Sequence, residues 1–176
     1  MKTTLLLENE SSKRLIFRKV TQEDFEDWLP FYHNPMSTQF WDGLPKDPLV
    51  ACNQQFERIF ERYKQGLGGM NALISKESSA LIGMCGLLVQ EVDGIQELEI
   101  GYSILPSYWR NGFAYEAASK CKSYAAQHQL AKSLISIIHI DNIPSQNVAL
   151  KNGMVLDKTT VYKDNPVHIF RTVFKE

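Results

Sequence analysis

The stretch from Glu97 to Ala118 combines two features whose residue types and spacing could do chemistry. Residues 97–105 alternate as a strand, and the end of a strand can hold a reacting group. A turn around Gly112 then opens a helix. Because glycine lets a ligand approach the backbone and free amides point out of a helix start, this turn could bind a phosphate. Taken alone, the turn is more simply a plain helix start with glycine there for packing.

The rest of the chain predicts the elements that must position this stretch. Apolar patterns predict strands at residues 14–20, 71–75, 80–91, 97–105, 134–140, 155–162 and 168–174. Helical spacing predicts about four helices: after Thr21, after Asp47, after Gly112 and within 141–153. The β-branched run at 134–140 is typical of a strand buried on both faces by parallel pairing. We therefore expect one α+β domain over residues 1–176, with a mixed sheet of six or seven strands.

Short sequence signals mark turns and helix starts. Asp93-Gly94 predicts a tight hairpin turn, so three antiparallel strands are expected to lead into residues 97–105. Asn165-Pro166 predicts the turn between the last two strands. Asp47-Pro48 predicts a helix start, with a capping carboxylate followed by proline.

Composition excludes several classes of function. The formal net charge is -1 and no Lys/Arg-rich run occurs, so we expect no nucleic-acid partner. The apolar runs are far shorter than the roughly 20 residues of a membrane span, so no membrane partner is expected. The three cysteines are widely spaced and odd in number, which indicates reduced, buried thiols in a cytoplasmic protein. The four histidines lack ligand spacing, so no metal site is predicted.

Three blocks in order carry a resemblance to a known family. Residues 99–102 (Glu-Ile-Gly-Tyr), followed by Pro106 and Trp109, form the first block. The second is Arg-Asn-Gly-Phe-Ala at 110–114, and the third is the pattern from Asn142 to Gly153. Together they resemble the GNAT superfamily of acetyl-CoA-dependent N-acetyltransferases, in particular its RimJ/RimL-like branch of ribosomal-protein N-acetyltransferases. The resemblance covers roughly residues 12 to 175.

The resemblance implies a cofactor cleft where the parallel strands 97–105 and 134–140 splay apart. The pantetheine of acetyl-CoA is expected to pair with the backbone around Tyr102, Ile104 and Leu105, like an added strand. The pyrophosphate is expected on the amides of Arg110, Asn111, Gly112, Phe113, Ala114 and Tyr115. Asn142, Ser145 and Lys151 are expected beside the cofactor. Asn142 could equally be a helix cap, and Lys151 a solvated surface lysine.

The same resemblance suggests how protons move. An amine must be neutral to attack a thioester, and the family pattern places Glu99 as the base or the holder of a water. Alternatively, Glu99 only orients the amine or satisfies a neighbouring backbone group. Backbone amides near Ile104 are expected to polarise the thioester carbonyl. Many members place a tyrosine where this chain has Ala149, so Ser145 or water is expected to protonate the thiolate, unless it leaves unprotonated.

The acceptor is less well specified. In this family the region of residues 34–45 lines the acceptor pocket, and Trp41 with Asp42 would suit a cationic amine. Alternatively, Phe40 and Trp41 are core residues, and His139 is expected to be a satisfied core histidine. We expect acetyl transfer to a primary amine, on a protein N-terminus or a small molecule, by direct attack in a ternary complex. The alternatives are a non-catalytic CoA-binding module or an interaction domain without cofactor; dimers are common in the family, but the oligomeric state stays open.

Overall fold

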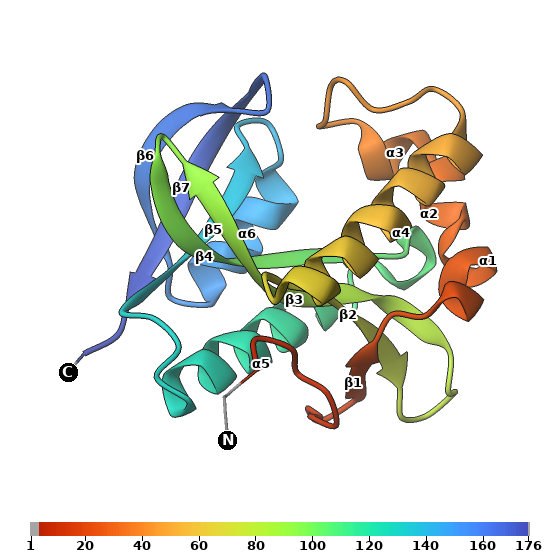
Figure 1. Cartoon of the computed structure of the whole chain (residues 1–176), viewed down its shortest axis with the longest axis horizontal. Helices are drawn as coiled ribbons and strands as arrows, with labels where there is room; N and C mark the ends of the chain where they lie inside the picture. Colours follow the sequence, from red (N-terminus) through yellow and green to blue (C-terminus); the bar gives the residue numbers. More distant parts are fainter. Residues whose placement is uncertain (1–3, 176) are drawn as a thin grey trace.

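The computed structural model describes residues 4–175, so the ends of the predicted domain 1–176 lie outside the described residues. One mixed sheet of seven strands runs in the order β1-β2-β3-β4-β5-β7-β6 (Figure 1). The strands are β1 (Leu15–Lys19), β2 (Gly68–Ser75), β3 (Leu81–Val92), β4 (Ile95–Ile104), β5 (Ser133–His139), β6 (Val155–Tyr162) and β7 (Asn165–Val173). The predicted α+β class and strand number are confirmed.

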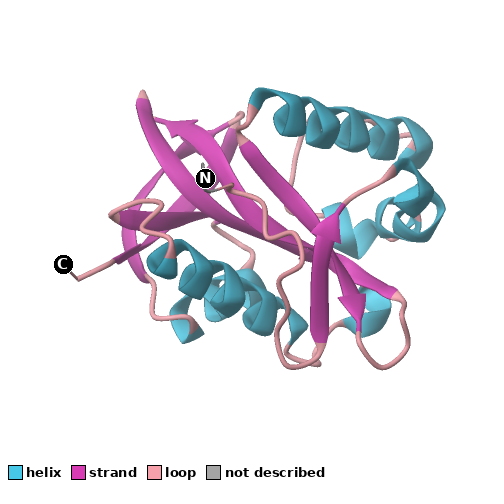
Figure 2. Ribbon diagram, turned by 60° about the horizontal axis from the view of Figure 1, so that its bottom comes forward, coloured by secondary structure: helices cyan, strands magenta, loops and turns pink. Residues whose placement is uncertain are grey.

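Helices lie on both faces of the sheet (Figure 2). The longer ones are α4 (Pro48–Gln65), α5 (Phe113–Gln127) and α6 (Ile143–Lys151). One further short segment, η2 (Pro106–Tyr108), follows β4. The predicted first helix is broken into the short segments η1 (Gln22–Asp24), α1 (Phe25–Trp28), α2 (Pro30–His33) and α3 (Pro35–Thr38). The break is explained by Pro30 and Pro35, which lack the amide that would continue a preceding helix and instead open new segments.

The β3–β4 hairpin fixes which residues of β4 face which helix. Asp93 and Gly94 both have positive φ, as the predicted two-residue turn requires, and Val92 lies opposite Ile95. Ile100 of β4 therefore packs with α5 in one core cluster, whereas Met84 of β3 packs with α4 in another. Because neighbouring strand residues point to opposite faces, Glu99 points to the α4 side.

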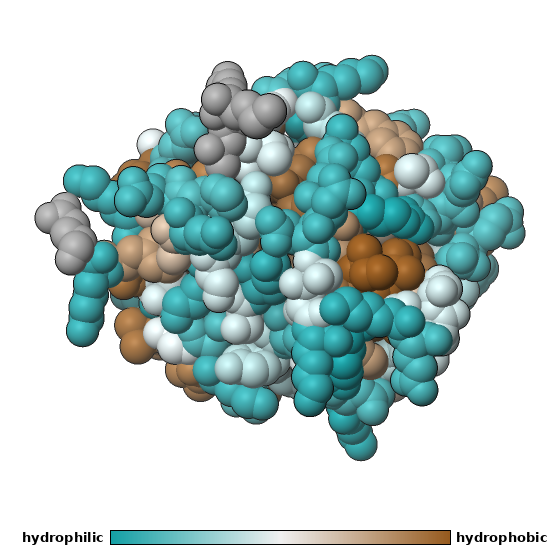
Figure 3. All heavy atoms as spheres, turned by 90° about the horizontal axis from the view of Figure 1, so that it is seen from below, coloured by the Kyte–Doolittle hydropathy of each residue, from teal (hydrophilic) through white to brown (hydrophobic). Residues whose placement is uncertain are grey.

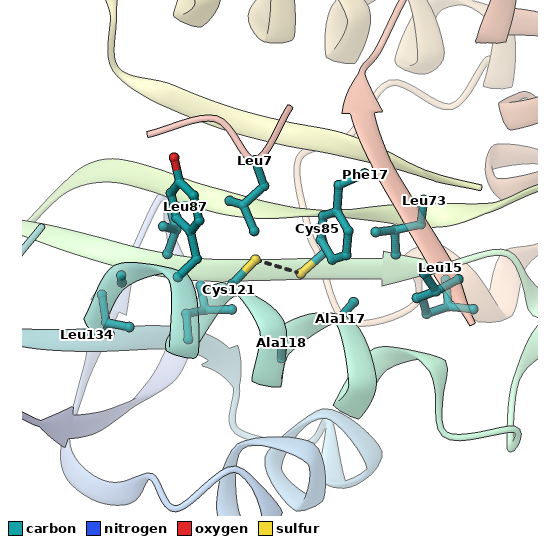
Figure 4. Close-up of a cluster of buried hydrophobic side chains, with 14 of the residues drawn as sticks. Leu7, Leu15, Phe17, Leu73, Cys85, Leu87, Ala117, Ala118, Cys121 and Leu134 are labelled. Atoms are coloured by element: carbon teal, nitrogen blue, oxygen red, sulfur yellow. Dashed lines mark hydrogen bonds between the residues drawn. The ribbon is translucent and has the colours of Figure 1, made fainter. Parts of the chain in front are cut away.

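Small residues let α5 approach the sheet closely. Ala117, Ala118 and Cys121 are buried against β3 and β4 (Figure 4). The Sγ atoms of Cys85 and Cys121 lie 3.6 Å apart, and both thiols are free. The prediction of buried, unpaired cysteines is confirmed.

Strands β4 and β5 run parallel and separate almost at once. Within residues 4–175 their ladder comprises the single pair Glu99–Ile135. Beyond this pair, β5 continues its hydrogen bonds on its other edge with β7, from Ser133–Val173 to His139–Val167. The gap between β4 and β5 therefore opens immediately after Glu99, as the predicted splay requires.

The last hairpin differs from the prediction. The turn residues are Lys163 and Asp164, both with positive φ, and not Asn165-Pro166. Asn165 is already paired with Tyr162 and is the first residue of β7. Its side-chain amide donates to the Lys163 carbonyl over 2.8 Å, which stabilises the tighter turn. Pro166 is tolerated because it lies next to the strand end, where few ladder bonds are lost.

The surface seen from below Figure 1 is mostly hydrophilic, and its apolar side chains form small areas among polar ones (Figure 3). Among residues 4–175, no helix has the length and apolar character needed to cross a bilayer.

Candidate active site

The backbone of β4 beyond Glu99 presents unpaired groups to the gap. The Leu105 amide donates to the Ile82 carbonyl on β3 over 3.0 Å. Because neighbouring residues of an antiparallel strand point their backbone groups to opposite edges, Tyr102 and Ile104 point theirs towards β5. The Ile100 carbonyl follows this alternation, since it accepts a 2.9 Å hydrogen bond from Ser136 of β5. The Tyr102 and Ile104 amides therefore face the gap that β5 leaves.

The backbone amide of Leu105 does not face the gap as the amides of Tyr102 and Ile104 do. Its amide bonds to β3, its carbonyl accepts from the Tyr108 amide over 2.9 Å, and its side chain is buried in the core. This residue has no backbone donor left for a cofactor, which corrects the expectation that Leu105 joins the pairing. The cause is the η2 turn, which closes directly on the end of β4.

Glu99 is the carboxylate at the point where the strands part. Gln90 donates a 2.9 Å hydrogen bond from Nε2 to Glu99 Oε2. Burial raises the pKa of Glu99, whereas Gln90, Arg62 and the Ile137 amide act to lower it, and burial prevails. Its neighbour on the same face, Glu97, instead forms a bidentate ion pair with Arg171: Nη2 donates to Oε1 at 2.7 Å and Nη1 donates to Oε2 at 3.0 Å. Of these two carboxylates, Glu99 is therefore the one that forms no ion pair within residues 4–175.

Gln90 holds Glu99 in place and was missed by the sequence analysis. Its Oε1 accepts from Arg62 Nη2 at 2.8 Å and from Tyr162 Oη at 2.9 Å, so its Nε2 is turned towards Glu99. The sequence did contain a pattern that predicts this contact. The Asp93-Gly94 turn puts Leu88 opposite Glu99, and Gln90 therefore lies diagonally beside Glu99 on the same face of the hairpin.

On the opposite face of β4, the side chain of Tyr102 reaches α6. Its hydroxyl donates to the Ser145 carbonyl at 2.7 Å and accepts from Ser145 Oγ at 3.1 Å. Burial raises the pKa of Tyr102, so the hydroxyl stays protonated. Asn142 caps α6 by accepting from the Ser145 amide at 3.2 Å, so the cap alternative for Asn142 is realised.

The turn before α5 exposes a set of free amides. Gly112 is the N-cap residue, with φ of 78°, and no side chain caps this end. The first intrahelical bond runs from the Glu116 amide to the Gly112 carbonyl, which leaves the amides of Phe113, Ala114 and Tyr115 without a partner inside the helix. Asn111 does not offer its side chain outward, because its amide donates to the carbonyls of Tyr108 and Trp109 at 3.1 and 3.0 Å.

Two cations flank this helix start. Arg14 of the segment before β1 donates to the Asn111 carbonyl at 2.9 Å and stacks over Phe113 at 4.1 Å. It also pairs with Glu116 at 3.2 Å. Lys151 of α6 lies over the ring of Tyr115 at 4.3 Å, so two of the predicted residues are brought together. Arg110 is exposed, with φ of 62°. The sequence contained no signal for Arg14, which lies 97 residues from Asn111.

The loop with Trp41 and Asp42 lies on the Glu99 face of the sheet. Trp41 packs with Tyr162 against a cluster that includes Ile135 and Ile137, so it is partly a core residue. The Asp42 amide donates to Asn165 Oδ1 at 2.8 Å, whereas the Asp42 residue is exposed. A pocket of about 200 Å³ beside Trp41 is lined by this loop and the start of α4. Phe40 stacks at a tilt on His139, with ring centroids 6.0 Å apart.

Comparison with known proteins places these features in context. The family profile described as the acetyltransferase (GNAT) domain matches residues 14–155. The uncharacterised N-acetyltransferase YoaA of Bacillus subtilis (strain 168) is 29% identical over 144 residues, covering 80% of this chain and 78% of that protein. The crystal structure of an acetyltransferase from Agrobacterium tumefaciens str. C58 aligns with a TM-score of 0.79 at 21% identity, over 98% of both chains. The ribosomal L7/L12 alpha-N-protein acetyltransferase RimL in complex with coenzyme A aligns with a TM-score of 0.74 at 13% identity, over 94% of this chain and 97% of that one.

Proposed function

The chain belongs to the GNAT acetyltransferase family, and from this premise we propose that it is an acetyl-CoA-dependent N-acetyltransferase acting on a primary amine. The observation that carries the proposal is the position of Glu99. Its carboxylate has a raised pKa and lies where β4 and β5 part, next to backbone amides without strand partners. A proton acceptor and hydrogen-bond donors for a carbonyl therefore meet at one place.

The residues present fit acetyl-CoA, which would supply the acetyl group as a thioester. The amide of Ile104 would pair with an amide carbonyl of the pantetheine, because it faces the gap and β5 does not use it, and the Tyr102 amide faces the same gap nearer to Glu99. The uncapped start of α5 at Gly112 would bind the pyrophosphate. Arg14, Arg110 and Lys151 would add positive charge at this end of the cleft.

Glu99 would take the proton that the acceptor amine must lose. Because its pKa is raised, the Glu99 carboxylate is a stronger base than a carboxylate with an ordinary pKa. As the amine nitrogen forms its bond to the acetyl carbon, the amide of Tyr102, which is nearer to Glu99 along β4, would stabilise the carbonyl oxygen. Residues Gln90, Arg62 and Tyr162 would act only by orienting Glu99.

Ser145 would return a proton to the leaving thiolate when the carbon–sulfur bond breaks. It is held beside the gap by Tyr102 and Asn142, and the position of the missing tyrosine is occupied by the buried Ala149. Tyr102 Oη donates to the Ser145 carbonyl and accepts from Ser145 Oγ, so the Ser145 hydroxyl would give up one hydrogen bond to turn towards the sulfur. The neutral amine loses one proton to Glu99 and the thiolate gains one from Ser145; water would then reprotonate Ser145 and take the proton from Glu99, so the reaction is balanced.

We further propose that the chain lies in the RimJ/RimL-like branch and functions in the cytoplasm. The likeness to RimL over 94% of this chain supports the branch. The acceptor would be a protein N-terminus or a small amine. The second candidate is a CoA-binding module without activity, which Ala149 favours and Glu99 opposes, because a binding module needs no buried base.

Thiol release tests the proposal directly. The protein is mixed with acetyl-CoA and a panel of amino acids, peptides, polyamines and amino sugars, and free CoA is followed with a thiol reagent. We expect release with at least one acceptor. Glu99→Gln should keep its affinity for CoA and lose roughly 10²-fold or more in kcat. CoA binding without release for any acceptor would favour the binding module.

A further inference from the structure

Three cations lie on the Glu99 side of the sheet, where the acceptor would enter, and two of them, Arg62 and Lys163, act on the charge of Glu99. Arg62 Nη2 contacts Gln90 Oε1, and the same oxygen accepts from Tyr162 Oη. The ammonium of Lys163 lies over the Tyr162 ring, 5.3 Å from its centroid. Arg58 precedes Arg62 by one turn of α4 and so projects from the same face of the helix. Helix α4 and the β6–β7 turn thus bring three positive charges together.

These charges lack carboxylate partners. Among residues 4–175, the ion pairs within 4.0 Å involve neither Arg58, Arg62 nor Lys163. Even Asp164, the next residue after Lys163, forms no ion pair with it. By contrast, Arg171 on the same sheet is paired with both Glu97 and Asp157. Burial first, and then the nearby charges of Arg58 and Arg62, lower the pKa of Lys163, and these causes outweigh the opposing charge of Glu99.

The excess positive charge affects an acceptor in two ways. It lowers the pKa of an ammonium group that approaches Glu99, because like charges disfavour the protonated form. This effect helps to produce the neutral amine that attacks the thioester. It also repels an acceptor whose charges are all positive, such as a polyamine. Binding then requires a negative group on the acceptor that compensates the cations.

Resting on the proposed function, we infer that the acceptor carries a carboxylate close to its amine, and that Arg58 and Lys163 bind this anionic group. Arg62 is not the main contact, because its Nη1 already donates to the Leu67 and Val89 carbonyls and its Nη2 to Gln90. Although Lys163 is partly desolvated, both it and Arg58 are exposed to solvent, and within residues 4–175 neither side chain makes a hydrogen bond.

The carboxylate of the acceptor can come from two kinds of molecule. It is either the α-carboxylate of a free amino acid or the side chain of an acidic residue at a peptide N-terminus. Both place a carboxylate within a few bonds of a primary amine. The exposed carboxylate of Asp42 on the neighbouring loop would favour a cationic acceptor instead, so polyamines belong in the same test.

The test compares matched acceptors with the whole protein. Glycine is compared with glycinamide, an Asp-initiated peptide amide with its Asn-initiated counterpart, and spermidine serves as the cationic amine. For each acceptor, kcat/KM is measured for the wild type, for Arg58→Gln/Lys163→Gln, and for Lys76→Gln as a control with one exposed charge removed on the β2–β3 turn. Amine pKa values differ within each pair, but they cancel when each variant is compared with the wild type.

We expect the double variant to lower kcat/KM for the anionic member of a pair roughly tenfold more than for the neutral member, with the effect shrinking as salt rises. The pair that responds identifies the source of the anion. Lys76→Gln should leave both members unchanged. Equal losses for both members, or spermidine as the preferred acceptor, would overturn the inference while leaving acetyl transfer intact. Absence of CoA release with every amine would instead count against the proposed function.

Discussion

Gln90 donates a 2.9 Å hydrogen bond from its side-chain amide to the carboxylate of Glu99, across the β3–β4 hairpin. Arg62 and Tyr162 hold the other end of the same amide, so Gln90 has one orientation that satisfies all three partners. The carboxylate is thereby fixed at the opening between β4 and β5. Its direction is set by residues of β3, α4 and β6, elements far apart in the chain.

Replacing Gln90 by leucine should change the pH dependence of the reaction. The Gln90 hydrogen bond lowers the pKa of Glu99, so its loss should raise that pKa further. Because Glu99 must be ionised to accept a proton, the acid limb of kcat/KM should move to higher pH. The measurement is a pH–rate profile of Gln90→Leu beside Gln96→Leu, an exposed position on β4. An acid limb that stays in place in Gln90→Leu would contradict the positioning role.

The stability of Glu99→Gln should depend on pH in a defined direction. Burial raises the pKa of Glu99 above its ordinary value, so the folded state holds the proton more tightly than the unfolded state. The stability from this group is present below the unfolded pKa and is lost as pH rises through the folded pKa. At pH 7.5, above the ordinary pKa of a glutamate, the variant avoids the cost of burying this carboxyl group and should gain about 0.5–2 kcal/mol in free energy of unfolding. Urea unfolding at pH 7.5 and in mild acid should show this gain shrinking as pH falls.

Glu97→Gln is the matched control for this stability effect. It makes the same change two residues away on the same face of β4, but it removes the ion pair with Arg171. Glu97→Gln should therefore be less stable than the wild type at pH 7.5. A loss of stability in Glu99→Gln comparable to that in Glu97→Gln would show that Glu99 serves the fold and not the reaction.

Gly112→Ala should weaken CoA binding more than its effect on folding explains. Gly112 has φ of 78°, where a side chain costs roughly 1–2 kcal/mol, and an added Cβ would meet Arg14 Nη2 at 3.6 Å, an ordinary contact. Gly94→Ala is the control, because φ is 76° and the space around it is open. Both variants should lose similar stability, but only Gly112→Ala should lose roughly tenfold in CoA affinity by calorimetry. Unchanged affinity would remove this turn from the pyrophosphate site.

Local signals were enough to predict much of the fold. Asp93-Gly94 set the β3–β4 register, and Asp47-Pro48 marked the start of α4, where Asp47 does cap the helix. The last turn was misplaced because Asn165-Pro166 is the stronger turn dipeptide, whereas Lys163 adopts a positive φ that lysine rarely takes.

The candidate site was predicted only in part, because its remaining residues come from distant segments. Glu99, Tyr102, Gly112 and Ser145 lie near the β4–β5 gap, within stretches that resemble known motifs. Arg14 reaches Asn111 across 97 residues, and Arg62 meets Gln90 across 28. Neither contact has a local pattern, since each depends on how β1 and α4 pack on the sheet.

Ser145→Ala tests how the thiolate is protonated. Ser145 Oγ donates to Tyr102 Oη at 3.1 Å, so its hydroxyl is held beside the gap but is not needed for the cap, which uses the Ser145 amide. Loss of a general acid should lower kcat roughly 10²-fold, with a smaller change in CoA affinity. Tyr102→Phe removes the partner of Ser145, and because the two residues share one contact, the double variant should lose less than the product of the single losses. Single-turnover rates and CoA affinities for the three variants provide this comparison. If kcat survives in Ser145→Ala, the thiolate leaves unprotonated or takes its proton from water, which its pKa near 8.5 permits.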